Sequence, residues 1–317
     1  MRDTLELNLL GGFQLLDAQG REIAIRGNKV KALLAYLALA PDGPQARAKL
    51  AGLVWGDHSE TRARQNLRQG LSTLRRALGE RADAILVTDE SSIKLAEGAV
   101  TTDAVMLERA VEDDDLEATI DLYTGELLDD LGPVFESFDD WLAAARLRLR
   151  DLAADSWQAL GERRMDSRDP AGAIEVARKL VELEVLREPA HRLLMRAYVA
   201  AGRRTEALQQ YHILERTLDA ELDATPDAES QRLFEEVGAK RSPPAPERAG
   251  EKPVIAVLPF TNMSGDPDQE YFADGITDDI ITELSRSRMF DVVARNSVFG
   301  YKGANVDIRR LGSELNV

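Results

Sequence analysis

In residues 1–98, apolar residues recur at every second position over short stretches and at helical spacing over longer ones. Apolar and polar residues alternate from Leu5 to Ile25, which predicts three short antiparallel strands with tight turns. Apolar residues at helical spacing predict a buried helix over Lys29–Ala40 and a shorter one over Ala46–Trp55. The runs Ala84–Thr88 and Ile93–Leu95 flank the polar turn Asp89–Ser92, which predicts a closing hairpin.

The stretch between the second helix and the hairpin is predicted to be an amphipathic helix. Four leucines recur at spacings of four, three and four, which places them on one stripe: Leu67, Leu71, Leu74 and Leu78. Ser59 is the expected N-cap and Gly79 the expected stop, so both ends are marked. The polar surface of this helix and one lysine of the hairpin supply the candidate DNA-binding residues: Arg62, Arg64, Gln65, Arg68, Gln69, Ser72, Thr73, Arg75, Arg76 and Lys94.

This third helix carries five arginines and almost only hydrogen-bond donors on its polar surface. A solvated surface helix normally mixes acidic and basic residues, because opposite charges one helical turn apart stabilise it. The arginine guanidinium donates paired hydrogen bonds to phosphates and guanine edges. Glutamine, asparagine and serine hydrogen-bond with other base edges. The pattern therefore favours a polyanion as partner over the alternative of a basic face with no partner. Strands, three helices and a hairpin in this order predict a winged helix-turn-helix.

From Thr101 to Val237 the sequence is predicted to be almost wholly helical, with an internal repeat. Trp157, Gly161 and Ala173 match the opening of a tetratricopeptide (TPR) pattern, and Ala207 follows Ala173 at the period of that pattern. Such helix pairs stack and leave a concave face for a partner. Three further helical segments precede the repeats: Asp103–Val111, Leu116–Leu122 and Phe138–Leu152.

The C-terminal part begins after a proline-rich stretch. A strand at residues 254–260, a helix at 272–285, a strand at 292–294 and a helix at 306–315 predict a parallel α/β unit. The expected fold is mainly α and multidomain. Its parts are a winged helix at 1–98, a TPR-like α-helical repeat domain at 99–240, a linker at 241–252 and a partial α/β unit at 253–317.

Charge divides along the same boundaries. The chain has a net charge of −16, but residues 1–98 hold 14 basic and 12 acidic residues, and residues 99–250 hold 19 and 33. Within residues 26–81 there are 11 basic and 4 acidic residues, so positive charge gathers around the third helix. The sequence has no cysteine, no long apolar run and no secretion signal, which predicts a cytoplasmic protein without a membrane span.

Sequence motifs for catalysis or cofactor binding are absent. The chain contains no phosphate-binding loop, no nucleophile elbow and no zinc-protease motif, so we expect neither an enzyme nor a cofactor. The acidic run Glu112–Asp115 is interpreted as a solvated helix start, and the carboxylates of Asp278 and Asp279 point to different helix faces. No metal site is therefore predicted.

Three regions resemble parts of known bacterial proteins. Leu9-Leu10-Gly11-Gly12-Phe13 and the third helix, in this order of elements, resemble the response-regulator type DNA-binding domain of SARP-like activators. The stretches 187–195 and 201–211 resemble the bacterial transcriptional activator domain (BTAD) that follows it in that family. Residues 256–262 and 271–280 resemble the amino-terminal module of TolB-like proteins, which also stands beside TPR arrays in some nucleotide cyclases.

These resemblances imply a DNA-binding transcriptional activator. The winged helix would bind promoter DNA as a homodimer, and the TPR-like domain would mediate dimerisation or contact RNA polymerase. Two alternatives stay open: a TPR-type interaction scaffold, and the regulatory fragment of a signalling enzyme such as a nucleotide cyclase. Salt-dependent DNA binding distinguishes the first hypothesis from the other two.

Overall fold

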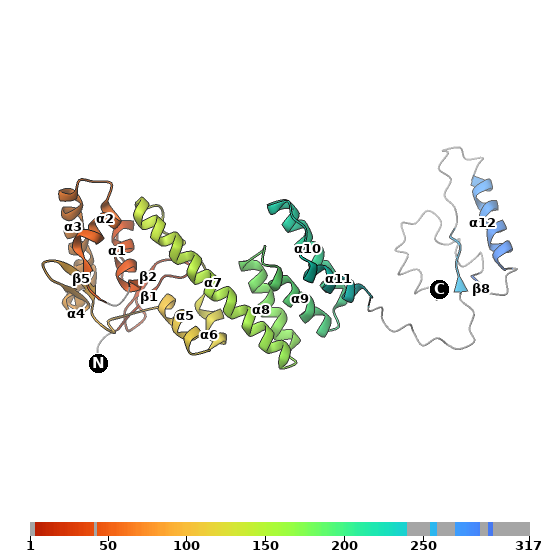
Figure 1. The fold of residues 1–317 in the computed structure, drawn as a ribbon, viewed down its shortest axis with the longest axis horizontal. Helices are drawn as coiled ribbons and strands as arrows, with labels where there is room; N and C mark the ends of the chain where they lie inside the picture. The colour runs from red at the N-terminus through yellow and green to blue at the C-terminus, as the bar shows by residue number, and fades with distance from the viewer. Residues whose placement is uncertain (1–3, 41–42, 240–253, 259–269, 286–290, 294–317) are drawn as a thin grey trace. The chain divides into compact units, whose positions relative to one another are not determined.

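The computed structural model describes residues 4–40, 43–239, 254–258, 270–285 and 291–293. The chain is mainly helical and divides into two compact units, residues 1–239 and 240–317 (Figure 1). The predicted helix at 306–315 lies outside the described residues.

Three helices form the first part of the N-terminal unit, as the periodicity predicts: α1 (Asn28–Leu39), α2 (Arg47–Trp55) and α3 (Glu60–Leu78). They pack because each buries one apolar face, and Leu33, Leu50 and Leu74 are fully buried where these faces meet. Two short helical pieces follow α3: η1 (Gly79–Arg81) and α4 (Ala82–Ile85). The first strand of the predicted hairpin is therefore shorter than expected, because its opening residues are helical.

The N-terminal sheet differs from the predicted three antiparallel strands. β1 (Leu5–Asn8) and β2 (Gln14–Leu16) are antiparallel as expected, but the segment around Ile23 and Ile25 forms only an isolated bridge between Leu16 and Glu22. The third strand is instead β6 (Val100–Thr102), which lies parallel to β1 on its other side. Ile25 is still buried, so its apolar character reflects packing rather than strand pairing.

A second small sheet contains the predicted hairpin. β4 (Leu86–Thr88) and β5 (Ser92–Leu95) are antiparallel, and β3 (Gln45–Ala46), just before α2, pairs with the other edge of β5. We call β4, β5 and the turn between them the wing. Its attachment through β3 places it beside the start of α2.

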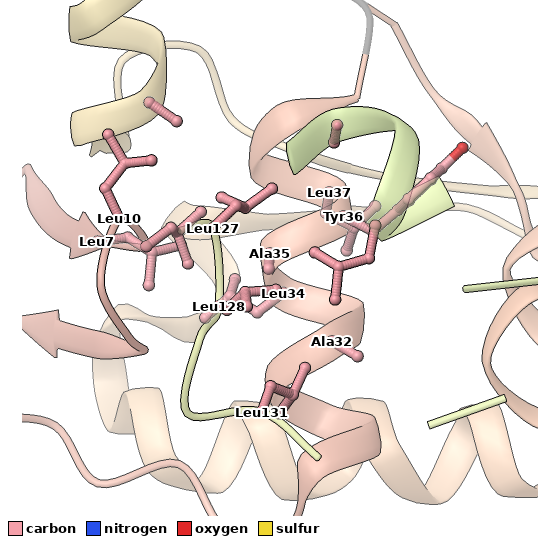
Figure 2. Packing of buried hydrophobic residues seen from close by; sticks show 14 of the residues in the cluster. Leu7, Leu10, Ala32, Leu34, Ala35, Tyr36, Leu37, Leu127, Leu128 and Leu131 are labelled. Atoms are coloured by element: carbon pink, nitrogen blue, oxygen red, sulfur yellow. The ribbon is translucent and has the colours of Figure 1, made fainter. Parts of the chain in front are cut away.

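Residues 1–98 share one hydrophobic core with the helices that follow. Figure 2 shows Leu127, Leu128 and Leu131 packed against α1, together with Leu7 and Leu10. The Asp103 carboxylate accepts hydrogen bonds from Leu9 N and Leu10 N at 2.9 and 2.8 Å. These bonds connect the end of β1 to the start of the helix that follows residue 102. Packing is therefore continuous across the predicted boundary at residue 98.

The helix α7 (Glu136–Asp166) is the long element of this unit. It contains the predicted segment Phe138–Leu152 and continues without a break through Trp157 and Gly161, where the first repeat begins. At its start the Trp141 ring meets Tyr36 of α1 edge to face, 5.0 Å between ring centroids. A Cβ on Gly56, at the end of α2, would overlap the Phe135 ring, so glycine permits this close approach. In Figure 1 α7 runs from α1 and α2 to α8.

The remaining helices of the unit are α5 (Asp103–Glu112), α6 (Leu116–Leu122), α8 (Pro170–Leu183), α9 (Glu188–Ala200), α10 (Arg204–Leu222) and α11 (Ala228–Ala239). Of these, α5, α6, α8 and α9 contact α7, while α10 packs on α9 and α11 packs on α10 and α9. Ala173 and Ala207, the equivalent small residues of successive repeats, are both fully buried in a second apolar cluster between α8 and α11. Small side chains at these positions let neighbouring helices approach closely.

In the C-terminal unit the structure describes β7 (Val254–Ile255), α12 (Glu270–Ser285) and β8 (Asp291–Val292). β7 and β8 are parallel, with α12 between them in sequence. This strand–helix–strand order is the one that the sequence predicts.

Candidate nucleic-acid interface

The helix α3 separates an apolar face from a polar one. Ala63, Leu67, Leu71, Leu74 and Leu78 are buried toward α1 and α2. Seven candidate residues on α3 are exposed: Arg62, Arg64, Gln65, Arg68, Gln69, Ser72 and Arg76. Lys94 of β5 is exposed as well. The tertiary structure therefore presents most of the predicted set to solvent.

Both predicted ends of α3 are found in the structure. Ser59 is the N-cap residue, although its side chain makes no capping hydrogen bond. Gly79 adopts a φ of 61° at the C-cap, and its N–H donates to Arg75 O. Glycine suits this position because a positive φ costs it little.

Four basic candidates have no ion-pair partner within the described ranges: Arg62, Arg68, Arg76 and Lys94. The Arg64 guanidinium instead pairs with Glu60 one turn earlier on α3. The unpaired cations keep their full charge for an outside anion, because no carboxylate of the described chain neutralises them.

Two candidates are only half exposed and already have intramolecular partners. The Thr73 hydroxyl donates to Gln69 O at 3.1 Å within α3. Arg75 Nη2 donates to Thr88 Oγ1 at 2.7 Å, and its Nε lies 3.9 Å from Asp83 Oδ1. Both side chains were predicted to contact DNA, whereas the structure shows Arg75 directed at the end of β4.

The turn of the wing is held by its own polar groups. Asp89 Oδ1 accepts from Ser91 N and Ser92 N at 2.7 and 2.6 Å, and Asp89 Oδ2 accepts from Ser92 Oγ at 2.6 Å. The hydrogen bond from the Ser92 hydroxyl, followed by the backbone N–H groups, holds the pKa of Asp89 well below its usual range. The carboxylate thus stays charged and locks the turn.

Arg47, a residue absent from the predicted set, fastens this turn to α2. Arg47 Nε donates to Asp89 O, and Arg47 N donates to Ser91 O, both at 2.9 Å. Nothing in the local sequence indicates this role, because the pairing of β3 with β5 brings the two segments together.

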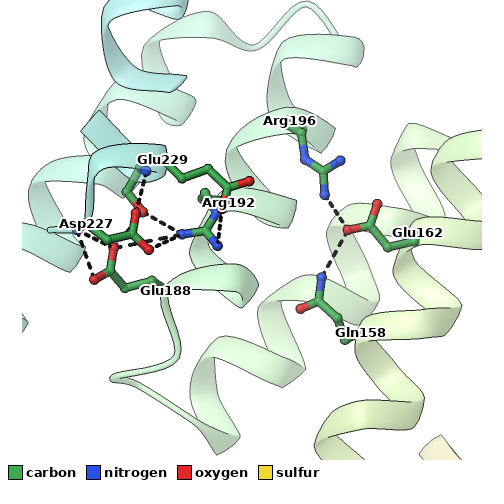
Figure 3. A network of polar contacts seen from close by, with 8 residues as sticks. Gln158, Glu162, Glu188, Arg192, Arg196, Asp227 and Glu229 are labelled. Atoms are coloured by element: carbon green, nitrogen blue, oxygen red, sulfur yellow. Dashed lines mark hydrogen bonds and ion pairs between the residues drawn. The ribbon is translucent and has the colours of Figure 1, made fainter. Parts of the chain in front are cut away.

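A second polar surface lies in the helical repeats. A groove of about 560 Å³ is lined by α7, α9 and α11 (Figure 3). Gln158 and Arg192 occupy corresponding positions of successive repeats, as do Glu162 and Arg196, and all four side chains line it. Gln158 Nε2 donates to Glu162 at 3.0 Å, and Arg196 pairs with the same carboxylate. Arg192, only 13% exposed, binds Asp227 and Glu229 at 2.8 and 3.0 Å.

Neither a metal site nor a membrane span is found among the described residues. They contain no group of three or more histidine, cysteine, aspartate or glutamate residues placed to hold a metal ion. None of the helices among them has the length and apolar character needed to cross a membrane.

The repeat region matches a known protein family. Residues 94–238 match the bacterial transcriptional activator domain. The match begins at Lys94, just before the predicted boundary, and covers the helices from α5 to α11. The predicted resemblance to this domain is thereby confirmed.

A solved structure has a similar fold. The chain aligns with Mycobacterium tuberculosis EmbR in complex with a low affinity phosphopeptide, with a TM-score of 0.59 and 19% sequence identity. The alignment covers 89% of this chain and 71% of that one. At this identity the likeness shows the shared fold.

A curated relative matches a short segment. A putative adenylate cyclase 3 of Rhizobium meliloti (strain 1021) is 65% identical over 66 residues, 21% of this chain. The matched segment is 11% of that protein's length. The predicted TolB-like module stays a prediction.

Proposed function

We propose that this protein is a DNA-binding transcriptional regulator, and that it activates transcription. The third helix α3 enters the major groove of promoter DNA, and the wing lies against the phosphate backbone. Gln65, Gln69 and Ser72 read base edges. The arginines of α3 that have no ion-pair partner among the described residues, which we call the free arginines, bind phosphates or guanine edges: Arg62, Arg68 and Arg76. Such a protein works where the bacterial chromosome is, in the cytoplasm.

One observation carries the proposal: the exposed side of α3 holds cations that no described carboxylate neutralises. A chain with 56 acidic and 40 basic residues has many carboxylates to place beside these arginines. Repulsion between unpaired arginines weakens a helix, and a polyanion removes that cost. The adjoining match to the bacterial transcriptional activator domain supports the same function.

We propose that the protein binds DNA as a homodimer and that the repeat region makes the protein contacts. The groove between α7, α9 and α11 is the candidate surface for RNA polymerase or another partner, since stacked helix pairs present such concave faces. No cofactor is invoked, and the regulator is not itself an enzyme.

The alternative is a regulatory part of a signalling enzyme, or an interaction scaffold. The short match to a protein named as a putative adenylate cyclase favours this alternative. Under it the chain has no function on DNA, and its basic face would not give salt-dependent binding to duplexes.

A salt titration of binding separates these functions. The purified chain is titrated with duplexes that it enriches from a random library, containing one or two half-sites. With about four phosphate contacts per subunit, the slope of log K against log[salt] should change from about −4 on one half-site to about −7 on two. Failure to bind any duplex at low salt would overturn the proposed function, and equal slopes on both DNAs would overturn the dimer.

A further inference from the structure

The wing presents charges of both signs, so its orientation decides whether it can approach DNA. Asp89 and Glu90 are exposed at its turn, where their carboxylates would be repelled by phosphates. Val87 and Lys94 are paired across the two strands and are both exposed. Cross-strand partners share one face of a sheet, so Val87 and Lys94 lie on the exposed face of the wing, whereas Thr88 and the buried Ile93 lie on the other face. Lys94 is therefore the cation that the exposed face of the wing offers to a phosphate.

Two arginines fix the wing at neighbouring positions. Arg47 of α2 holds the turn through Asp89 O and Ser91 O. Arg75 of α3 holds Thr88, the residue immediately before the turn, through a 2.7 Å hydrogen bond to Oγ1. Each of the two helices α2 and α3 therefore holds the wing through one hydrogen-bonding arginine. The bond from Arg75 joins the wing directly to the helix that carries the free arginines.

We propose that Arg75 is a positioning residue for DNA binding rather than a contact to bases or phosphates. Its guanidinium holds Thr88 so that Lys94 on the wing and Arg62, Arg68 and Arg76 on α3 reach one duplex together. The inference rests on the proposed function. It assigns a different role to Arg75, which is one of the residues predicted to contact DNA. A hydrogen bond from a charged donor is strong enough for this role, because it is shorter and stronger than a neutral one.

Substitution of the acceptor separates positioning from direct contact. Thr88→Val removes the hydroxyl from a half-buried side chain and changes no charge, so it leaves any phosphate contact of Arg75 in place. In the full chain we expect Thr88→Val and Arg75→Met each to weaken binding to the selected duplexes about tenfold. The double variant should be no weaker than either single one, because both changes remove the same link. Thr88→Ser keeps the acceptor and should bind as the unsubstituted protein does.

A second double-mutant cycle tests whether the phosphate contact of Lys94 depends on Thr88. On a duplex with one half-site, Lys94→Met should lower the magnitude of the salt slope by about 0.9 when Thr88 is present. It should have little effect in the Thr88→Val background, where Lys94 no longer reaches the phosphate. Arg76→Met, which removes a cation of α3, should have its full effect in both backgrounds. General loss of fold would weaken both effects alike, so it would not produce this selectivity; thermal unfolding checks that each variant is folded.

The possible outcomes are distinct. Thr88→Val with unchanged affinity beside a weakened Arg75→Met would overturn the proposal, because Arg75 would then act on DNA without Thr88. A full effect of Lys94→Met in the Thr88→Val background would also overturn it. If the unsubstituted chain binds no duplex, the proposed function fails first and the positioning role fails with it.

Discussion

The arginines of α3 and those of α7 and α9 have different surroundings. Within the described part of the chain, Arg62, Arg68 and Arg76 of α3 have no carboxylate partner. Every arginine of α7 and α9 has one: Arg146, Arg148, Arg150, Arg163, Arg164, Arg192 and Arg196. Most of these ion pairs join different helices of the repeat region. The arginines of α7 and α9 are thus used internally, while three of the five arginines on α3 are left available.

This difference shows how a strongly acidic chain can present a basic surface. Ion pairs in the repeat region neutralise arginine where it joins helices, while α3 carries only Glu60 as an acidic residue, at its first turn. Electrostatic interactions are screened over about 8 Å at physiological ionic strength, so distant carboxylates do not cancel the local field. Net charge is therefore a poor guide to what one surface binds.

The largest expected effect comes from separating the two regions. A fragment of residues 1–98 lacks β6 and the leucines at 127, 128 and 131 that cover α1, and should show no cooperative unfolding. A fragment of residues 1–239 should unfold in one cooperative transition. Circular dichroism during heating measures both. A cooperative transition in the shorter fragment would show that the α3 region is structurally independent of the repeats.

The next effect tests the free arginines against the paired ones. Changing Arg62, Arg68 and Arg76 together to glutamine should lower the magnitude of the salt slope of binding to one half-site by about 3, because each phosphate contact contributes about 0.9. The matched control changes Arg163, Arg187 and Arg196, which are paired with carboxylates, to glutamine and should leave the slope unchanged. Equal losses in both variants would remove the distinction between the two regions.

A smaller effect compares two paired arginines. Arg192→Met leaves Glu188, Asp227 and Glu229 without their common cation and should lower the free energy of unfolding by about 2 kcal/mol. Arg163→Met breaks an exposed pair and should cost less than about 1 kcal/mol. Chemical denaturation gives both values. Similar losses would mean that burial does not set the strength of these pairs.

The smallest expected effect concerns His191, a residue of the repeat region that is buried without charge. His191 Nε2 lies 3.0 Å from Val185 O, and Nδ1 lies 2.8 Å from Gln210 Nε2, which fits a neutral ring that donates to the carbonyl and accepts from the amide. Burial lowers the pKa of His191 below its ordinary value of 6.5. The unfolded chain therefore binds more protons than the folded one just below that pH.

Stability should accordingly decrease as the pH falls through about 6.5 toward the lower pKa of the folded protein, by at most about 1.4 kcal/mol per pH unit from this group. Well above pH 6.5 His191 contributes no pH dependence. Urea unfolding at a series of pH values measures the slope, and His191→Gln should reduce it. An unchanged slope in His191→Gln would contradict this assignment.

Much of the candidate site could be predicted because its signal is local. The leucine spacing of α3 specifies which face is buried, and so which side chains are exposed. The repeat period likewise predicts that Ala173 and Ala207 occupy equivalent buried positions. The exceptions are Thr73, whose hydroxyl donates to Gln69 O one turn earlier in α3, and Arg75, whose partner Thr88 lies on the wing and cannot be read from a helical wheel. Arg47 was missed because its partner Asp89 lies far along the chain, on the wing.

The helices, the amphipathic face of α3 and the charge division can be inferred from the sequence, because they depend on the order of neighbouring residues. Which distant segments meet depends on the packing of the whole unit. β6 is the third strand of the N-terminal sheet and lies parallel to β1, while the predicted third strand around Ile23 forms only an isolated bridge. The fold also directs Arg75 to Thr88 and gives residues 1–98 and the first helices of the predicted repeat domain one shared core. Such contacts depend on how whole faces pack, because a side chain's partner is set by the surfaces that burial brings together.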